Sequence, residues 1–221
     1  MANLMQMKVL EDLNGFLLVD KPAGIAFASV LKAVKRKFNL VKVGHGGSLD
    51  AMASGLFILL LGDANKFVGD VMGADREYTG VMKRGETTDT GDVWGRSIPL
   101  PSRVASVDEV RGDLFQTEPR FCAIRKEGTA EYEVVDTGDH SQFLAHVYRF
   151  DLMDDGAFGL KASKGVIVRA LAQDMGATLM SLRRTKVGKF DVADAIPFDR
   201  LLETEMKDFP SCVTPLSKAL Q

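Results

Sequence analysis

The spacing of hydrophobic and polar residues along the chain predicts strands and helices in irregular alternation. Residues 15–20 are mostly apolar and are followed by a turn sequence with proline and glycine at 21–24, so we expect a strand that ends there. Residues 56–61 form an unbroken apolar run, which predicts a buried strand or a buried helix. Further strands are expected at residues 76–82, 143–151, 158–162 and 182–190.

Helical spacing is clearest at residues 29–39. Apolar residues recur there on one side, while four cations among residues 32–37 occupy the other side, and Ser29 is expected to cap the helix. The cationic side is either a surface that faces RNA or a solvated face, and the sequence leaves both interpretations open. Further helices are expected at residues 64–72, 107–115, 170–180 and 199–206.

Polar and turn-forming residues separate these elements without a linker or an internal repeat. Residues 87–92 predict a local turn, residues 118–128 a strand with a hairpin turn, and residues 136–141 a polar loop. The mixture of strands and helices predicts an α+β fold with a mixed, mainly antiparallel sheet flanked by helices. We expect one domain over residues 1–221, with its core at about 13–196 and a tail at 197–221.

Composition narrows the class of protein. The chain has 221 residues, 46% of them hydrophobic, which suffices for a substantial core. No apolar run approaches the roughly 20 residues that span a bilayer, and the first residues lack a secretion signal, so we expect a cytoplasmic protein or an organellar one that has lost its leader. The net charge of −2 argues against an indiscriminate nucleic-acid coat protein but allows a local basic patch.

Cysteine and carboxylate spacing gives no metal site. Cys122 and Cys212 lie far apart and outside any CxxC or Cys/His cluster, so we expect two small hydrophobic residues in a reducing compartment. The acids and threonines at residues 87–92 do not have the spacing of a calcium loop. These segments therefore predict neither a zinc site nor a calcium site.

Asp50 is the first candidate for chemistry. It follows a glycine-rich stretch at residues 44–48 and precedes the apolar run at 56–61, so its carboxylate is held near the interior on backbone that bends sharply. The alternative is that Asp50 caps a helix beginning near Ala51. Arg169 follows three apolar residues and needs an acid partner if it is partly buried. Lys21, at a turn, either meets a phosphate or carboxylate or is simply solvated.

Seven segments, taken in order, resemble the TruB-type tRNA pseudouridine synthases. They are GFLLVDKPAG (15–24), VGHGGSLDAMASG (43–55), LGDANKF (61–67), REYTG (76–80), GETTDTGDVWG (85–95), SKGVIVR (163–169) and LRRTKVGKF (182–190). The resemblance covers residues 13–196. It implies the pseudouridine-synthase fold and the isomerisation of a uridine in structured RNA, foremost the T-loop uridine of tRNA, by a monomer without metal or organic cofactor.

The resemblance also implies roles for individual residues. Asp50 matches the catalytic aspartate, Tyr78 the tyrosine that stacks on the target base, and Arg169 the arginine that pairs with the aspartate. Among the expected substrate-binding residues, His45 matches a histidine that fills the space left by the flipped nucleotide, and Leu182 an apolar wall of the base pocket. The remaining substrate-binding residues expected from the matched segments are Lys21, at a turn that supports the pocket, Gly47, Lys164 and Ile167.

Elementary chemistry agrees with such a site. A stacked base is inaccessible, so the enzyme must flip it out at a cost of a few kcal/mol that aromatic stacking and edge contacts recover. A carboxylate that attacks must be ionised, yet a pocket dry enough to hold uracil disfavours charge. A guanidinium beside the carboxylate favours the ionised form.

The chain departs from the family pattern at several positions. Ile167 stands where a tyrosine is usual, which removes an aromatic contact, and Gly46 and Ala51 replace threonine and proline, which is expected to loosen the Asp50 loop. Phe121 or Cys122 represent a usual tyrosine and serine, and Arg125 a usual lysine. The acidic loop at 136–141 is expected to repel phosphate, and a C-terminal PUA domain is not expected after the last matched segment.

These departures leave a competing hypothesis. The first hypothesis is a single-domain pseudouridine synthase acting on tRNA. The second is a weak or inactive relative that binds structured RNA as a folding aid or as a component of a ribonucleoprotein. A third is a protein-interaction scaffold built on an old enzyme fold.

Overall fold

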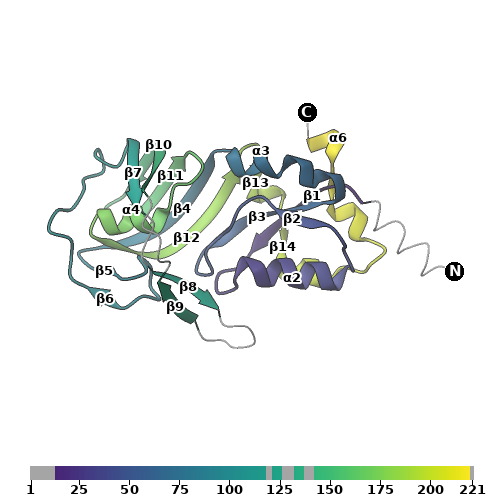
Figure 1. Cartoon of the computed structure of the whole chain (residues 1–221), viewed down its shortest axis with the longest axis horizontal. Helices are drawn as coiled ribbons and strands as arrows, with labels where there is room; N and C mark the ends of the chain where they lie inside the picture. Colours follow the sequence, from purple (N-terminus) through teal and green to yellow (C-terminus); the bar gives the residue numbers. More distant parts are fainter. Residues whose placement is uncertain (1–12, 118–120, 126–131, 137–141, 220–221) are drawn as a thin grey trace.

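The computed structural model describes residues 13–117, 121–125, 132–136 and 142–219, and it shows an elongated molecule built on one long sheet (Figure 1). The strand order is β14-β1-β3-β12-β4-β11-β10-β7, with β15 on β1, β2 on β3 and β13 on β12. The bounds are β1 (Gly15–Lys21), β2 (Val43–His45), β3 (Ser54–Leu61), β4 (Arg76–Arg84), β7 (Gly112–Thr117), β10 (Gln142–Leu152), β11 (Ala157–Ala162), β12 (Ala177–Val187), β13 (Phe190–Asp191), β14 (Ile196–Pro197) and β15 (Thr214–Pro215). Because β3 pairs with β12, and β1 with β14, in parallel while the other pairs are antiparallel, the predicted mixed, mainly antiparallel α+β fold is confirmed.

Two small ribbons and short helices complete the described part of the chain. Strands β5 (Thr87–Thr88) and β6 (Ser97–Ile98) form one ribbon, and β8 (Phe121–Arg125) and β9 (Tyr132–Asp136) form the other. The helices are α2 (Phe27–Lys37), α3 (Val68–Gly73), α4 (Val168–Asp174), α5 (Phe198–Glu203) and α6 (Leu216–Ala219), with 3₁₀ turns η1 (Gly62–Phe67), η2 (Val192–Asp194) and η3 (Phe209–Cys212). Residues 137–141 of the predicted polar loop lie outside the described residues.

The half of the sheet built on β1 and β3 is buried on both faces. On one face Leu17 and Phe57 pack with Val34 of α2, and Leu201 of α5 joins the same cluster. On the opposite face Leu18, Ile58 and their neighbours pack with Val71 of α3. Figure 1 shows α2 and α3 on opposite sides of these strands. A strand covered on both faces needs apolar residues at every position, which explains the unbroken run at 56–61 and identifies it as a strand.

The other half, built on β4, β11, β10 and β7, is buried on one face. Tyr78, Met82, Phe150 and Leu160 form a core there together with Leu171 of α4. Residues that alternate with them, such as Thr79 and Val81, are exposed. This alternation is typical of a sheet that packs one face on the core and exposes the other face to solvent.

Three helix predictions need correction. Ser29 does not cap α2, because Ala26 is the N-cap residue and Ser29 lies within the first turn. The helix predicted at 107–115 is wrong: residues 107–110 form a turn, Gly112 takes φ +85°, and β7 follows. The helix predicted at 170–180 ends at Asp174, because Gly176 at φ +60° turns the chain into β12. The four cations of α2 are exposed, as expected of a solvated face.

Candidate active site

Asp50 lies in the connection between β2 and β3, and no helix follows it, so the helix-cap interpretation is wrong. The backbone around it is fixed by several hydrogen bonds. Gly24 N donates to Ala51 O at 2.8 Å, Ala53 N donates to Asp50 O at 3.1 Å, and Gly47 turns the chain at φ +116°. The side chain of Asp50 is 42% exposed, so its carboxylate is presented from a fixed loop.

Lys21 is buried beneath this loop. Its ammonium donates to Pro22 O at 2.8 Å, Ile25 O at 2.7 Å and Ala51 O at 3.4 Å. Burial lowers the pKa of Lys21 to about 8, although the nearby charge of Asp50 acts in the opposite direction. Lys21 therefore supports the Asp50 loop from behind, and its solvated interpretation is wrong.

Close packing against α3 explains why glycine stands at position 46. A Cβ at this position would collide with Val71 of α3, and Gly46 N donates to Ile58 O at 2.9 Å. Glycine is thus needed where the helix crosses the loop. The loop is anchored here, although the loss of the usual threonine was expected to loosen it.

Arg169 forms an ion pair with Asp50. Its Nε donates to Asp50 Oδ2 at 3.0 Å and its Nη1 to Thr90 O at 2.6 Å. Arg169 lies in the first turn of α4 and only 8% of its side chain is exposed, so the acid partner demanded by burial is Asp50. The pair joins segments 119 residues apart.

The turn that holds Arg169 is the predicted one at residues 87–92. Thr90 Oγ1 donates to Asp92 Oδ1 at 2.8 Å, and Trp94 N donates to the same oxygen at 2.9 Å, which confirms the local turn. Burial raises the pKa of Asp92, while these hydrogen bonds and the charge of Arg169 act against the rise. Asp92 is therefore a second carboxylate in the surroundings of Arg169.

Tyr78 lies on β4 directly opposite Arg184 of β12, and both are almost completely buried. The Arg184 guanidinium donates from Nε to Leu56 O at 2.8 Å and from Nη1 to Ser48 O at 2.7 Å. Burial lowers the pKa of Arg184, which the Tyr78 phenol and the Asp50 carboxylate partly oppose. Arg184 thus joins β3, the Asp50 loop and the tyrosine.

These groups line one cleft of about 610 Å³. Seven of the predicted site residues line it: Gly47, Asp50, Tyr78, Lys164, Ile167, Arg169 and Leu182. Ile167 forms part of the wall without closing the cleft, and Lys164 is exposed. A volume of this size is typical of a small-molecule site and accepts a nucleobase with its sugar.

Two predicted residues do not line the cleft. Lys21 lies behind the Asp50 loop, as described above. His45 is in β2, where Gly47 N donates to its Nδ1 at 3.3 Å and its ring centroid lies 5.2 Å from that of Phe27. Burial lowers the pKa of His45, which favours the neutral ring as an acceptor. In this structure His45 braces the loop rather than facing the cleft.

Several residues around the cleft were missed by the sequence analysis. Arg76, Arg184 and Leu144 line the cleft, and Gln116 lies behind its wall. Gln116 Nε2 donates to Ile167 O at 3.2 Å, and Ile167 N donates to Gln116 Oε1 at 3.0 Å, so one buried amide holds the N-cap residue of α4. Arg76 donates to Ala74 O at 2.9 Å and to Met72 O at 3.0 Å. For Arg76 and Arg184, the available signal was an arginine at a position that the strand pattern places in the interior.

The described residues were also compared with the requirements of a metal site and of a membrane-spanning helix. These residues contain no cluster of three or more His, Cys, Asp or Glu side chains placed to hold a metal ion. Within the same part of the chain, none of the helices has the length and apolar character needed to cross a membrane.

Comparisons with known proteins show the family of the chain. Residues 35–155 match the family model described as TruB family pseudouridylate synthase (N terminal domain). The tRNA pseudouridine synthase B of Opitutus terrae is 32% identical over 230 residues, covering 95% of each chain. That of Gluconacetobacter diazotrophicus is 34% identical over 232 residues, covering 94% of this chain and 76% of the relative.

Solved structures show the same fold. The archaeal box H/ACA sRNP Nop10–Cbf5 complex matches with a TM-score of 0.64 and 21% identity, covering 96% of this chain and 63% of that one. An H/ACA RNP bound to a substrate RNA containing 2′-deoxyuridine matches with a TM-score of 0.65 and 22% identity, and this chain spans 62% of its length. The predicted pseudouridine-synthase fold is thereby confirmed. The sequence relatives and the family model together show that the chain belongs to the TruB family of pseudouridylate synthases.

Proposed function

We propose that this TruB-family pseudouridine synthase isomerises a uridine in the T loop of tRNA, with Asp50 as the nucleophile. The single observation that carries the proposal is the ion pair between Asp50 and Arg169 at 3.0 Å, in the same cleft as Tyr78. RNA is the partner of this family. The names of the curated relatives, tRNA pseudouridine synthase B, support tRNA as the substrate of this chain.

The reaction needs no external reactant. In the proposed sequence the Asp50 carboxylate attacks C1′ of the flipped nucleotide, and the N1–C1′ bond breaks with its electron pair going to the uracil ring. The ring turns, C5 attacks C1′, and Asp50 leaves as carboxylate. The C5 proton is then lost and N1 gains a proton, so product and substrate are isomers. Attack of Asp50 on the base in place of the sugar leaves the same overall balance.

Arg169 and Tyr78 have complementary roles in this proposal. Arg169 holds one carboxylate oxygen through Nε, which favours the ionised nucleophile and orients it. Tyr78 is fixed between β11 and β12 and supplies the aromatic wall for the uracil ring. Leu182 contributes an apolar wall, and the exposed Lys164 is available to an RNA phosphate at the cleft.

One observation favours the second hypothesis of RNA binding without efficient turnover. Ile167 occupies a wall position where the family has a tyrosine, so the base has one aromatic neighbour fewer. The retained contact between Asp50 and Arg169 favours the enzyme, because a protein that only binds RNA has no need for a partly exposed carboxylate on an RNA-facing surface.

Release of the C5 hydrogen tests the proposal directly. A tRNA transcript labelled with tritium at uridine C5 should release tritium to water with the wild-type chain, and mapping should place the product in the T loop. Asp50→Asn should reduce release at least roughly 1,000-fold, since it removes the nucleophile while preserving the size of the side chain. RNA binding without release by the wild-type chain would favour the folding-aid hypothesis instead.

A further inference from the structure

An exposed row of ring and apolar side chains crosses the edge strands β7 and β10. It comprises Phe115, Leu144, His146 and Tyr148, and we call it the outer stripe. Phe115 is 74%, Leu144 57% and Tyr148 50% exposed, and the His146 side chain is 42% exposed. An exposed apolar patch of this kind on a soluble protein commonly marks a binding surface.

The strand register places these side chains next to one another. Leu144 pairs directly with Phe115, and His146 pairs with Asp113, so both pairs project from the same face two residues apart. The ring centroids of His146 and Tyr148 lie 4.7 Å apart. The stripe is therefore one continuous surface across two strands.

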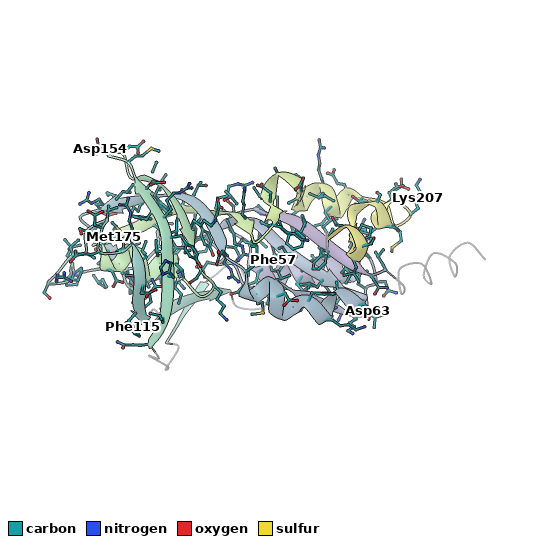
Figure 2. The ribbon with its side chains drawn as sticks, turned by 90° about the horizontal axis from the view of Figure 1, so that it is seen from above. Phe57, Asp63, Phe115, Asp154, Met175 and Lys207 are labelled. Carbon is teal, nitrogen blue, oxygen red and sulfur yellow. The ribbon has the colours of Figure 1, made fainter. Side chains whose placement is uncertain are left out.

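The stripe begins at the cleft. Leu144 lines the same cleft as Asp50, and its pair partner Phe115 extends the surface away from it. Gln116, the next residue of β7, points to the opposite face and holds Ile167 in the cleft wall. Figure 2 shows Phe115 at the outer margin of the molecule, at the end of the β10–β11 hairpin that is remote from Asp154.

The carboxylates beside the stripe already have partners. Asp113 Oδ1 lies 2.6 Å from His146 Nδ1, and the Tyr148 hydroxyl donates to Asp75 Oδ1 at 3.2 Å. Ring faces on an open antiparallel sheet are a surface on which unpaired RNA bases stack, and stacking tolerates any base because each has a π face. An acidic partner protein would instead require unpaired cations here.

We propose that the outer stripe binds unpaired bases of the substrate RNA next to the flipped uridine, as the strand leaves the cleft over Leu144. This inference rests on the proposed function and extends it by naming where the flanking nucleotides lie. The stripe supplies affinity for RNA, while Asp50, Arg169 and Tyr78 act on the flipped nucleotide.

Binding of a fluorescein-labelled, unmodified tRNA transcript tests the proposal. The double variant Phe115→Ser, Leu144→Ser should raise Kd roughly 5- to 100-fold, with the slope of log Kd against log salt unchanged, because stacking and not ion release is lost. Met153→Ser, at the far turn of the same hairpin and 63% exposed, is the matched control and should bind as the wild type does.

A spectroscopic variant separates stacking from a change in fold. F115W should keep the wild-type Kd, and its added tryptophan emission should be quenched by the transcript beyond the quenching of Trp94, the single tryptophan of the native chain. A Kd of the double variant equal to that of Met153→Ser overturns the proposal and leaves the proposed function intact. Loss of self-association in the double variant, with RNA binding unchanged, would identify the stripe as a contact between copies of the chain.

The two claims fail in different ways. Asp50→Asn should bind the transcript like the wild type, so its loss of tritium release reports on catalysis alone. Failure of the wild-type chain to bind the transcript at all would overturn both the stripe and tRNA as substrate.

Discussion

The two halves of the sheet differ in how many of their faces are buried. Around β1 and β3 both faces are covered, and residues from Leu56 to Leu61 are all buried. Around β10 and β7 only one face is covered, and the other carries the outer stripe. The contrast separates a frame, whose sequence is dictated by packing, from a working surface whose exposed positions are free to serve binding.

β12 joins these halves and places the site at their junction. It runs parallel to β3 and antiparallel to β4, so Arg184 reaches both the Asp50 loop and Tyr78. Beside it Arg183 makes a two-pronged contact with Asp20 of β1, at 2.9 and 2.7 Å. The cleft is therefore held rigid by the frame around β1 and β3. It is accessible because the other half of the sheet is covered on one face.

Two phenylalanines give the sharpest way to break this comparison (Figure 2). Phe57→Ala, in the frame, should lower the free energy of unfolding by about 3–5 kcal/mol, because a fully buried ring leaves a cavity. Phe115→Ala, in the one-sided half, should change it by less than about 0.5 kcal/mol. Urea denaturation of the two variants measures both values. Equal losses would show that the stripe is packed in solution and would contradict the comparison.

The pH dependence of stability sharpens the same contrast at Lys21. Its pKa is about 8 in the folded chain and near 10.5 when unfolded, so the unfolded state binds more protons between these values and stability rises with pH across that window. The burial penalty is fully present below pH 8. It is relieved by up to about 3 kcal/mol as the pH approaches 10.5.

Urea denaturation at pH 7.5 and pH 10, compared between the wild type and Lys21→Met, isolates this contribution. The variant loses the ammonium hydrogen bonds at both pH values, but only the wild type should gain stability from the titration of Lys21. A pH dependence that is identical in the two proteins would mean that the ammonium is solvated and that burial of the frame stops short of the Asp50 loop.

Gln116 tests how the one-sided half positions the chemistry. Gln116→Glu keeps the size of the side chain but loses the donor to Ile167 O, so α4 should shift and Arg169 should hold Asp50 less well. We expect kcat to fall about 10-fold with little change in KM, since the RNA contacts proposed for the outer stripe lie outside the substituted position. Gln142→Glu, exposed on the neighbouring strand, is the control and should leave kcat unchanged. A rise in KM alone would contradict a positioning role.

Much of the fold follows from local patterns, and the failures have physical reasons. The alternation at 76–82 predicts a strand because burial on one face dictates residue choice at every second position. The run at 56–61 predicts a buried element but leaves strand and helix open, because burial on all sides looks alike in both. The helix expected at 107–115 failed because a positive φ at Gly112 separates a turn from an edge strand whose side chains alternate. Spacing along the chain does not reveal such a break.

The site divides in the same way. Asp50, Tyr78 and Arg169 could be named as candidates because they stand in recognisable segments, and the need of Arg169 for an acid was predictable from its apolar neighbours. Gln116 and Arg184 were missed because their importance depends on strand register, which brings Gln116 against Ile167 and Arg184 opposite Tyr78. His45 contacts Gly47 and Phe27 instead of lining the cleft, an arrangement that spacing along the chain does not reveal.

The parallel pairing of β3 with β12 also has a consequence for biosynthesis. The chain from η1 to α4 lies between these two strands in the sequence. β3 therefore pairs with a strand, β12, that is translated more than a hundred residues later. Such distant pairing slows folding. On the ribosome, a nascent chain that has not yet reached Arg169 carries Asp50 without its ion-pair partner, and the cleft is assembled only when most of the chain has emerged.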